Sequence, residues 1–238
     1  MSGFTINPFS GAKISSTLAT DLRAWWPLEG SPWLDSHSAG PYTLSATNAP
    51  GTGTGKIASC LDVELSSTQW LYLENHADFR PGDTDFSWSC WVNAESLGGA
   101  NGVFGKWHPS TASENEYCLI ELAGDFAFFV HDGTATQTSV SAGVSISTAT
   151  WYHVVCWHDS VNNEIGVAVD DATPVTAAHS AGVNTGGSSR FEIGGYTNTG
   201  AAQWDGLIDE VGFWNKVVSA AEITELYNSG NAIGYSDL

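Results

Sequence analysis

The sequence predicts an all-β protein, a two-sheet antiparallel jelly-roll sandwich with one short C-terminal helix. Three observations lead to this prediction. Short apolar runs, rich in aromatic and branched residues, recur along the chain with turn-forming residues between them. Only one segment, near the C-terminus, has the apolar spacing of an amphipathic helix. The chain has 238 residues, a length that a sandwich of this kind reaches as one domain.

The predicted strands follow one another from residue 24 to residue 214. The clearest one begins at Phe86, where Phe86, Trp88, Cys90 and Val92 alternate along the chain and therefore share one face. The full set of predicted strands is 24–28, 57–63, 69–73, 86–92, 102–107, 117–122, 126–130, 151–157, 164–169, 190–193 and 207–214. The Gly-Thr repeat at 51–55 is predicted to be a flexible loop. It lacks the Lys-Ser or Lys-Thr pair that a phosphate-binding loop requires.

A short helix is predicted directly after the last strand. Ser219 and Glu222 have the spacing of a capping box, in which a hydroxyl and a carboxylate satisfy free amides at a helix start. Ile223, Leu226 and Tyr227 would form one apolar stripe along the helix. An Asn-Ser-Gly sequence follows and offers a glycine for a left-handed helix end.

The charge of the chain limits the partners that it can have. Asp and Glu number 26 against 7 Lys and Arg, so the formal net charge is −19. Such a field repels phosphate backbones and anionic membranes, which argues against nucleic acid as a partner. No stretch of 18 apolar residues occurs, so membrane insertion is not expected. Neutral glycans, protein surfaces and divalent cations remain as candidate ligands.

The N-terminal residues differ from the rest of the chain. Residues 1–22 show no clear periodicity and are predicted to be an extended arm before a domain that spans 23–238. The arm is either a frayed terminus or a docking arm, because Phe4, Ile6 and Phe9 stand at nearly alternate positions. A docking arm would join the chain to a homo-oligomer or to a capsid lattice. The start of the chain lacks the basic and apolar regions of a secretory signal.

The four cysteines are Cys60, Cys90, Cys118 and Cys156, and none belongs to a Cys-x-x-Cys pair. Each one stands inside an apolar strand pattern. One interpretation is that they are four small buried hydrophobic residues. The other is that they form one or two disulfides, because their number is even, and Cys90 could meet Cys156 if their strands pair.

Five segments together resemble the laminin-G-like domains of the concanavalin A-like lectin/glucanase superfamily. In chain order they are 26–36, 55–62, 86–92, 151–163 and 206–230. They look like the opening strand with its Asp-Ser turn, the second strand, two central strands, and the closing strand with its helix. The resemblance implies a jelly roll over about residues 24–230. It leaves the function open, because lectins, glycosidases, adhesion modules and virion proteins all use this fold.

The pattern of acidic residues does not indicate catalysis. The resemblance implies that a glucanase would carry Glu-x-Asp-x-x-Glu on one strand, which places three carboxylates on one face for retaining hydrolysis. The nearest match, at 207–210, lacks the first and the last acid. Glu121 and Asp125 are separated by a turn, and Glu192 stands alone in its strand. We therefore expect no enzymatic activity, with a glycoside hydrolase or polysaccharide lyase as the alternative.

Calcium is the expected metal, because calcium takes roughly six to eight oxygen ligands and the predicted loops are rich in acids and amides. The resemblance implies a structural calcium where the first and last strands meet. Carried over to this sequence, it points to Asp209, with Glu29 and Asp35 as companion ligands. Asp209 could equally cap a turn or pair with a lysine.

Aromatic residues in loops are the candidate contacts for a glycan, since sugars stack their apolar faces on exposed rings. Trp107 and His108 stand at a strand end before a polar loop. Tyr196, Asn198 and Trp204 form the second predicted set. The chain has 11 tryptophans, so most of them belong to the core, and Trp107 or Trp204 could instead seal the edge of the sandwich.

These features predict a non-catalytic binding or adhesion module that recognises glycan or protein surfaces, with calcium in a structural role. An initiator methionine, no signal sequence and an N-terminal arm favour a virion surface protein, such as a phage decoration or fibre component. The expected location is therefore extracellular or on a virion surface. The same features also fit a trimmed lectin module from a secreted bacterial adhesin.

Overall fold

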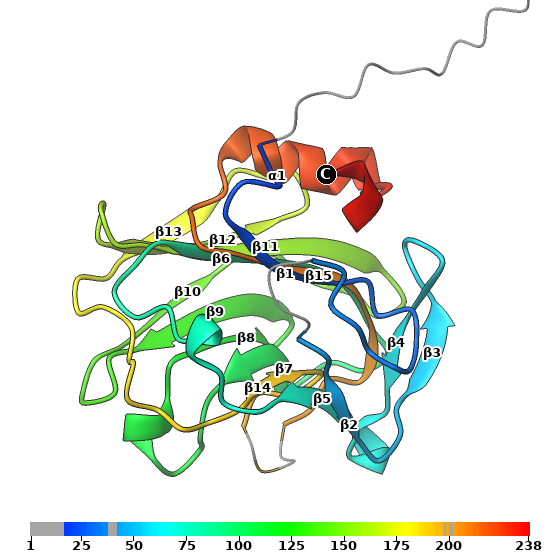
Figure 1. Cartoon of the computed structure of the whole chain (residues 1–238), viewed down its shortest axis with the longest axis horizontal. Helices are drawn as coiled ribbons and strands as arrows, with labels where there is room; N and C mark the ends of the chain where they lie inside the picture. Colours follow the sequence, from blue (N-terminus) through cyan, green and yellow to red (C-terminus); the bar gives the residue numbers. More distant parts are fainter. Residues whose placement is uncertain (1–16, 38–41, 198, 200–201) are drawn as a thin grey trace, which may run out of the picture.

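The computed structural model describes residues 17–37, 42–197, 199 and 202–238, which form two antiparallel sheets packed face to face (Figure 1). One sheet has eight strands in the order β13-β12-β11-β6-β15-β4-β3, with β1 paired to β15. The other has seven strands in the order β10-β9-β8-β7-β14-β5-β2. The predicted all-β sandwich with a single short α-helix is confirmed.

The strands of the eight-stranded sheet are β1 (Leu22–Trp26), β3 (Gly51–Thr54), β4 (Ser59–Val63), β6 (Phe86–Ala94), β11 (Trp151–Asp159), β12 (Glu164–Val169), β13 (Val175–Ala178) and β15 (Gly206–Trp214). The seven-stranded sheet contains β2 (Ser45–Thr47), β5 (Trp70–Leu73), β7 (Ala100–Lys106), β8 (Tyr117–Leu122), β9 (Asp125–His131), β10 (Gln137–Ser141) and β14 (Phe191–Ile193). The helix α1 spans Ala220–Tyr227, and short 3-10 turns lie at Leu65–Ser67, Ala77–Phe79, Ala112–Glu114, Asn228–Gly230 and Tyr235–Asp237. No helix in these described ranges is long and apolar enough to cross a membrane.

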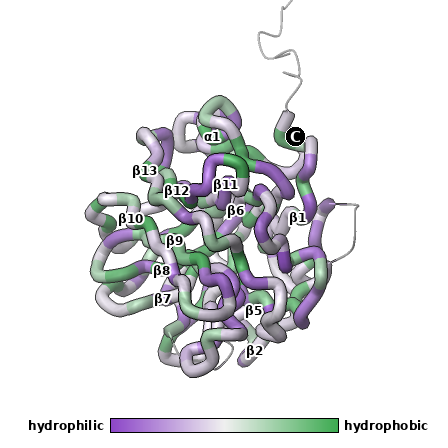
Figure 2. Tube along the Cα trace, turned by 90° about the vertical axis from the view of Figure 1, so that its left-hand side faces the viewer, coloured by the Kyte–Doolittle hydropathy of each residue, from purple (hydrophilic) through white to green (hydrophobic). Residues whose placement is uncertain are grey.

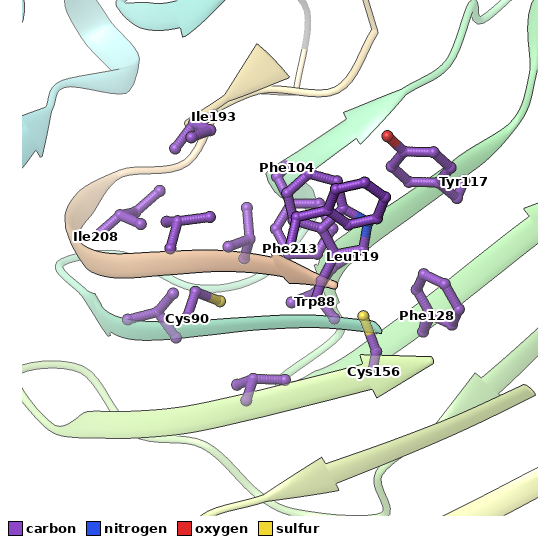
Figure 3. Close-up of a cluster of buried hydrophobic side chains, with 14 of the residues drawn as sticks. Trp88, Cys90, Phe104, Tyr117, Leu119, Phe128, Cys156, Ile193, Ile208 and Phe213 are labelled. Carbon is purple, nitrogen blue, oxygen red and sulfur yellow. The ribbon is translucent and has the colours of Figure 1, made fainter. Parts of the chain in front are cut away.

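The main core lies between the two sheets and is rich in aromatic rings (Figure 3). The alternation predicted for β6 is confirmed, because Phe86, Trp88, Cys90 and Val92 all point into this core. The fully buried Trp88 ring stacks on Phe213, with centroids 4.3 Å apart, at the centre of the sandwich. Such rings bury a large apolar area each, so this cluster supplies a large part of the hydrophobic stabilisation.

All four cysteines are buried free thiols, which agrees with the interpretation of small buried hydrophobic residues. Strands β6 and β11 do pair, with Cys90 opposite Val154 and Cys156 opposite Trp88. The two cysteines therefore share the core face at diagonal positions and are not direct cross-strand neighbours (Figure 3).

The helix α1 covers the outer face of the eight-stranded sheet in both views (Figures 1 and 2). Its predicted capping box is present between Ser219 and Glu222. The left-handed residue directly after the helix is Asn228, with φ of 48°, and not the glycine that the sequence suggested. The apolar cluster beneath the helix contains Trp25, Val155, Trp214, Val218, Ile223 and Leu226.

The sequence prediction missed the short strands β2, β10 and β13, and it differs from the structure in two further segments. Residues 51–54 are not a loop but the edge strand β3, paired with β4. Glycine suits this strand, because a Cβ on Gly53 would lie 2.7 Å from Leu207 Cδ2. Residues 17–22, assigned to the arm, pack on the domain, since Leu18 is fully buried and the Thr17 hydroxyl donates to Glu222 at 2.6 Å. The rest of the predicted arm, 1–16, lies outside the described residues.

Candidate functional site

A β-bulge in β15 places two consecutive acids on the outer side of the eight-stranded sheet. Ile208 and Val211 both point into the core, and Asp209 and Glu210 lie between them. The pairing of β15 with β6 shifts register here, and Glu210 has a left-handed backbone with φ of 47°. The extra residue of a bulge interrupts the strict alternation of a strand, so both carboxyl groups leave the core on the same side.

Both acids are buried. Asp209 is fully buried, and its Oδ2 accepts the backbone N–H of Lys56 at 2.7 Å and of Ile57 at 3.1 Å. Burial raises the pKa of Asp209 to about 7, against the lowering effect of these amides. Burial also raises the pKa of Glu210 to about 8, and the neighbouring Asp209 charge adds to this, although the Trp25 indole N–H donates to its carboxylate.

Three oxygen atoms converge beside Gly55, directly in front of Asp209. A Cβ added to Gly55 would lie 2.5 Å from Asp209 Oδ2, 2.6 Å from the Ser59 carbonyl oxygen and 2.9 Å from the Ile57 carbonyl oxygen. Calcium bonds oxygen at roughly 2.3–2.6 Å and accepts carboxylate and carbonyl ligands together. The three distances, however, are to a point one bond length from the Gly55 Cα, so they show why this position is a glycine and do not define a calcium site.

Of the two predicted companion ligands, Glu29 lies near Asp209, whereas Asp35 lies in a separate turn. Glu29 Oε2 accepts the Ser59 N–H at 2.8 Å, and its charge contributes to the raised pKa of Asp209. Asp35 Oδ1 accepts the N–H groups of Trp25 and His37, at 2.8 and 2.9 Å, and so shapes the chain after β1. In the described part of the chain, no three His, Cys, Asp or Glu side chains gather around a metal position. A cation at Asp209 would therefore depend on backbone carbonyls.

The alternative role of Asp209 as a turn cap is also visible. Its carboxylate holds the turn at Lys56 and Ile57 through their backbone amides. The Lys56 side chain does not pair with it; its ammonium donates to the Gly230 carbonyl and lies 4.5 Å from the centroid of the Trp91 ring.

The second candidate site is an aromatic groove of about 230 Å³ on the outer face of the seven-stranded sheet. Its residues are Trp107, Cys118, Ile120, Leu122, Phe129, Gln137 and Tyr196. The alternation of β8 explains the floor, because Tyr117 and Leu119 point into the main core while Cys118 and Ile120 point outward. The only polar groups among these side chains, apart from the Cys118 thiol, are the Gln137 amide, the Trp107 indole N–H and the Tyr196 hydroxyl.

The aromatic rings of the groove are held by their neighbours. Trp107 meets Phe129 edge to face, with centroids 6.3 Å apart, and meets the His131 ring at 5.7 Å. Tyr196 lies directly over Gly102, where an added Cβ would be 2.3 Å from its ring. A groove of this size, with fixed rings and few polar groups, suits one ring-shaped or apolar group of a ligand.

The structure places the residues that were predicted to contact a glycan in different environments. Trp107 and Tyr196 come together in the aromatic groove. His108 lies beside it and shapes a turn, with its backbone N–H donating to Asn115 Oδ1 at 2.7 Å. Trp204 is 1% exposed and lies in the main core, so contrary to expectation it offers no ring face to a ligand. Asn198 lies outside the described residues.

Sequence reasoning missed Phe129 and Gln137, which also line the groove. For Phe129 a signal existed. In β9, Phe126, Phe128 and Val130 alternate as core residues, which leaves Phe129 on the outer face. Gln137 carries no such signal, because its strand β10 is short and polar.

The isolated acids that could suggest catalysis are used in structural contacts. Glu121 is buried and accepts hydrogen bonds from Asn101 Nδ2 at 2.8 Å and from the Gly124 N–H at 2.6 Å. Glu192 accepts the Arg190 Nε–H at 2.9 Å. The buried His153 ring contacts the Ser89 hydroxyl at 2.8 Å, and burial lowers its pKa to about 3. None of the described residues that line the aromatic groove is an acid.

The comparison with protein families gives one match, to the Concanavalin A-like lectin/glucanases superfamily, over residues 65–224. The chain belongs to this superfamily. The resemblance seen in the sequence is therefore confirmed, and the two-sheet sandwich is the fold expected of a member. A search of curated proteins found no match.

Solved structures similar to this superfamily member include several binding domains. Domain 4 of AbnA, an extracellular arabinanase from Geobacillus stearothermophilus solved with arabinotriose, is 17% identical, with a TM-score of 0.67, and the match covers 86% of this chain and 97% of that one. The binding domain of Paraclostridial Mosquitocidal Protein 1 has 11% identity and a TM-score of 0.73, over 88% of this chain and 52% of that one.

A third similar structure is the receptor binding domain of botulinum neurotoxin mosaic serotype C/D, with 11% identity and a TM-score of 0.65, over 88% of this chain and 51% of that one. This chain thus spans about half the length of each toxin domain. At these identities the similarity establishes the fold.

Proposed function

We propose that this chain is a non-catalytic binding module that holds one sugar ring of a glycan in the aromatic groove. The observation that carries the proposal is the meeting of Trp107, Phe129 and Tyr196 on an outer sheet face, with the Gln137 amide at hand for a hydroxyl group. Rings held in this way stack on the apolar face of a sugar. The similar structures support the proposal, since one of them was solved with arabinotriose and another is a receptor binding domain.

The experiment is binding of a panel of oligosaccharides, including arabinotriose and sialyllactose, followed by calorimetry on any hit. Tyr196→Ala removes one wall of the groove and should weaken a hit tenfold or more. Tyr235→Ala is the matched control, because Tyr235 packs on the α1 side of the opposite sheet. A hit that both variants bind equally well would place the glycan elsewhere. Binding of an apolar peptide in place of any glycan would assign the groove to a protein surface.

We also propose that calcium is bound at Asp209 in a structural role. The neighbouring carboxyl groups of Asp209, Glu210 and Glu29 support this. Two buried acids side by side are unfavourable when ionised, and a dication would offset their charges. The melting temperature with and without EDTA tests this proposal, and an unchanged value would remove calcium from the account.

We also propose an extracellular or virion-surface location, on the basis of the similar structures. The similar structures include a domain of an extracellular enzyme and the binding domains of a mosquitocidal protein and of a neurotoxin. A phage decoration or fibre component and a lectin module of a secreted adhesin remain the two forms of this proposal. Assembly through residues 1–22, as a homo-oligomer or on a capsid lattice, is tested by light scattering on the full chain and on a chain that begins at Thr17. Only the full chain should assemble.

A further inference from the structure

The bottom of the aromatic groove is apolar across three neighbouring strands, and we call this part the floor. Its central residues, Cys118 and Ile120, are 2% and 4% exposed and point outward from β8. Their cross-strand partners on the same face are small or apolar. Strand by strand, the floor consists of Gly102 and Gly105 of β7, Cys118 and Ile120 of β8, and Ala127 and Phe129 of β9. Because β8 is paired on both sides, the only hydrogen-bonding side chain of the floor is the Cys118 thiol, a weak donor.

The stronger hydrogen-bonding groups of the groove belong to side chains outside the floor. They are the Trp107 indole N–H, the Gln137 amide and the Tyr196 hydroxyl. None of the three has a hydrogen-bond partner within the described part of the chain. The groove therefore suits a ligand with hydroxyl groups on one side and an apolar group on the other.

The rings of the groove form a corner instead of one flat platform. The planes of Trp107 and Phe129 stand at 75° to each other, and those of Trp107 and His131 stand at 88°. A sugar lays its flat apolar face on a single ring, whereas two rings at nearly a right angle enclose a small group that projects from the sugar. Such a group would meet the floor, so it should be apolar and no larger than a few atoms.

The charge of the protein excludes acidic sugars from this groove. None of the described residues that line it is charged, so no cation is present to pair with a carboxylate or a sulfate group. The net charge of −19 repels such groups from the whole molecule. The sugar should therefore be neutral.

We propose that the sugar held in the aromatic groove is a neutral 6-deoxyhexose whose methyl group lies on the floor, an inference that rests on the glycan function proposed above. An ordinary hexose carries a hydroxymethyl group at the same carbon. Its hydroxyl would lose water at the floor without gaining a strong partner. An N-acetyl group also ends in a methyl, but it brings an amide N–H and a carbonyl that the floor cannot satisfy.

The test is an NMR titration of the ¹⁵N-labelled chain with two matched pairs of sugars. Methyl α-L-fucoside and methyl α-L-galactoside differ only in the oxygen at C6, and so do methyl α-L-rhamnoside and methyl α-L-mannoside. We expect the deoxy member of at least one pair to shift the Trp107 indole N–H and the Gln137 side-chain amide. It should bind about tenfold to a hundredfold more tightly than its partner, the range in which an apolar site rejects an added hydroxyl.

Variants of the floor test whether this preference arises there. Cys118→Ser and Ile120→Thr each place a hydroxyl on the floor, so each should reduce the affinity ratio within the pair severalfold. Cys60→Ser is the matched control, because Cys60 is a buried cysteine in β4 of the other sheet. It should keep the ratio of the parent. The ratio is the useful measure, since a variant that only loosens the fold would weaken both members of a pair alike.

Several outcomes would overturn the 6-deoxyhexose and leave the glycan function in place. They are equal affinity within both pairs, tighter binding of an N-acetylglucosaminide, an unchanged ratio in both floor variants, or shifts at Trp107 with another neutral sugar but with none of these four. If no sugar of a wider panel shifts the Trp107 indole N–H, the glycan function and the 6-deoxyhexose are both wrong.

Discussion

Asp209 and Glu210 are consecutive in β15, yet both carboxyl groups lie on the outer side of the eight-stranded sheet, because a bulge separates the inward-pointing Ile208 and Val211 by two residues. A regular strand would have turned one of the two acids toward the core. The bulge instead brings together two buried acids whose pKa values rise to about 7 and about 8. The effect of this pair on folding stability can be measured by varying the pH and by adding calcium.

In the absence of calcium, the pair should make the protein less stable as the pH rises. Unfolded Asp and Glu ionise near about pH 4, whereas folded Asp209 and Glu210 keep their protons to about pH 7 and 8. Their contribution to the unfolding free energy is therefore complete below about pH 4 and lost by about pH 8, at about 1.4 kcal/mol per pH unit for each group.

Between pH 6.5 and 8 the buried His153 and His158, with lowered pKa values, no longer oppose this effect. Glu116, whose pKa burial also raises to about 8, contributes to the same extent in the parent and in a variant of Asp209. Urea unfolding in EDTA should show a steeper loss of stability in this window for the parent than for Asp209→Asn. Equal slopes would mean that Asp209 is ionised in the folded protein without metal.

Bound calcium should oppose the loss of folding stability that Asp209 and Glu210 cause as the pH rises. A bound dication favours the ionised form of Asp209, so the rise in melting temperature on adding Ca²⁺ should be several degrees and larger at pH 8 than at pH 5. Asp209→Asn should abolish the rise, and Glu29→Gln should reduce it. Asp35→Asn should keep it, because Asp35 shapes a separate turn. Loss of the calcium response in Asp35→Asn alone would return Asp35 to the set of ligands.

The wall of the aromatic groove should depend on Gly102. A methyl group at this position would overlap the Tyr196 ring, so Gly102→Ala should displace Tyr196, cost about 1–3 kcal/mol of stability and weaken any groove ligand. Gly51→Ala is a suitable control, since its added Cβ meets nothing closer than 3.8 Å. Chemical denaturation and ligand titration of both variants would check this, and unaltered ligand affinity in Gly102→Ala would exclude Tyr196 from the site.

The core should be most sensitive at Trp88. Its fully buried ring stacks on Phe213 and on Phe191, with centroid separations of 4.3 and 4.7 Å. Trp88→Ala would leave a cavity between the sheets and should cost about 3–5 kcal/mol. Val161→Ala, at a side chain that is 77% exposed, should change stability by less than about 0.5 kcal/mol. Denaturant midpoints for the two variants measure the difference, and a similar loss in both would contradict this account of the core.

Local sequence patterns predicted the parts of the fold that local physics decides. The alternation at Phe86 to Val92 and the Ser219–Glu222 capping box each depend on neighbours within a few residues, and both are present. The edge strand β3 (Gly51–Thr54) was missed because two glycines and two threonines carry no apolar period. Its conformation depends on pairing with β4 and on close contact with Leu207, which lies far away in the sequence.

The candidate sites, too, depend on contacts between residues that are far apart in the sequence and were not predictable from local patterns. Tyr196 and Trp107 were predictable as aromatic residues near strand ends, but only the fold shows that they meet and that Trp204 turns inward. A polar cleft of about 540 Å³ at one end of the sandwich combines residues 77–85 with Ser160 and Asn215, which no sequence spacing connects.

The position of α1 also gives the molecule a front and a back. Thr17, where the described chain begins, bonds to Glu222 of α1, and Leu238 packs against the same helix cluster (Figure 1). Both ends of the described domain therefore lie behind the eight-stranded sheet, while the aromatic groove faces away from it on the other sheet. Any body fixed to this domain through either end would hold it by its back, so that the groove points outward into the surrounding medium.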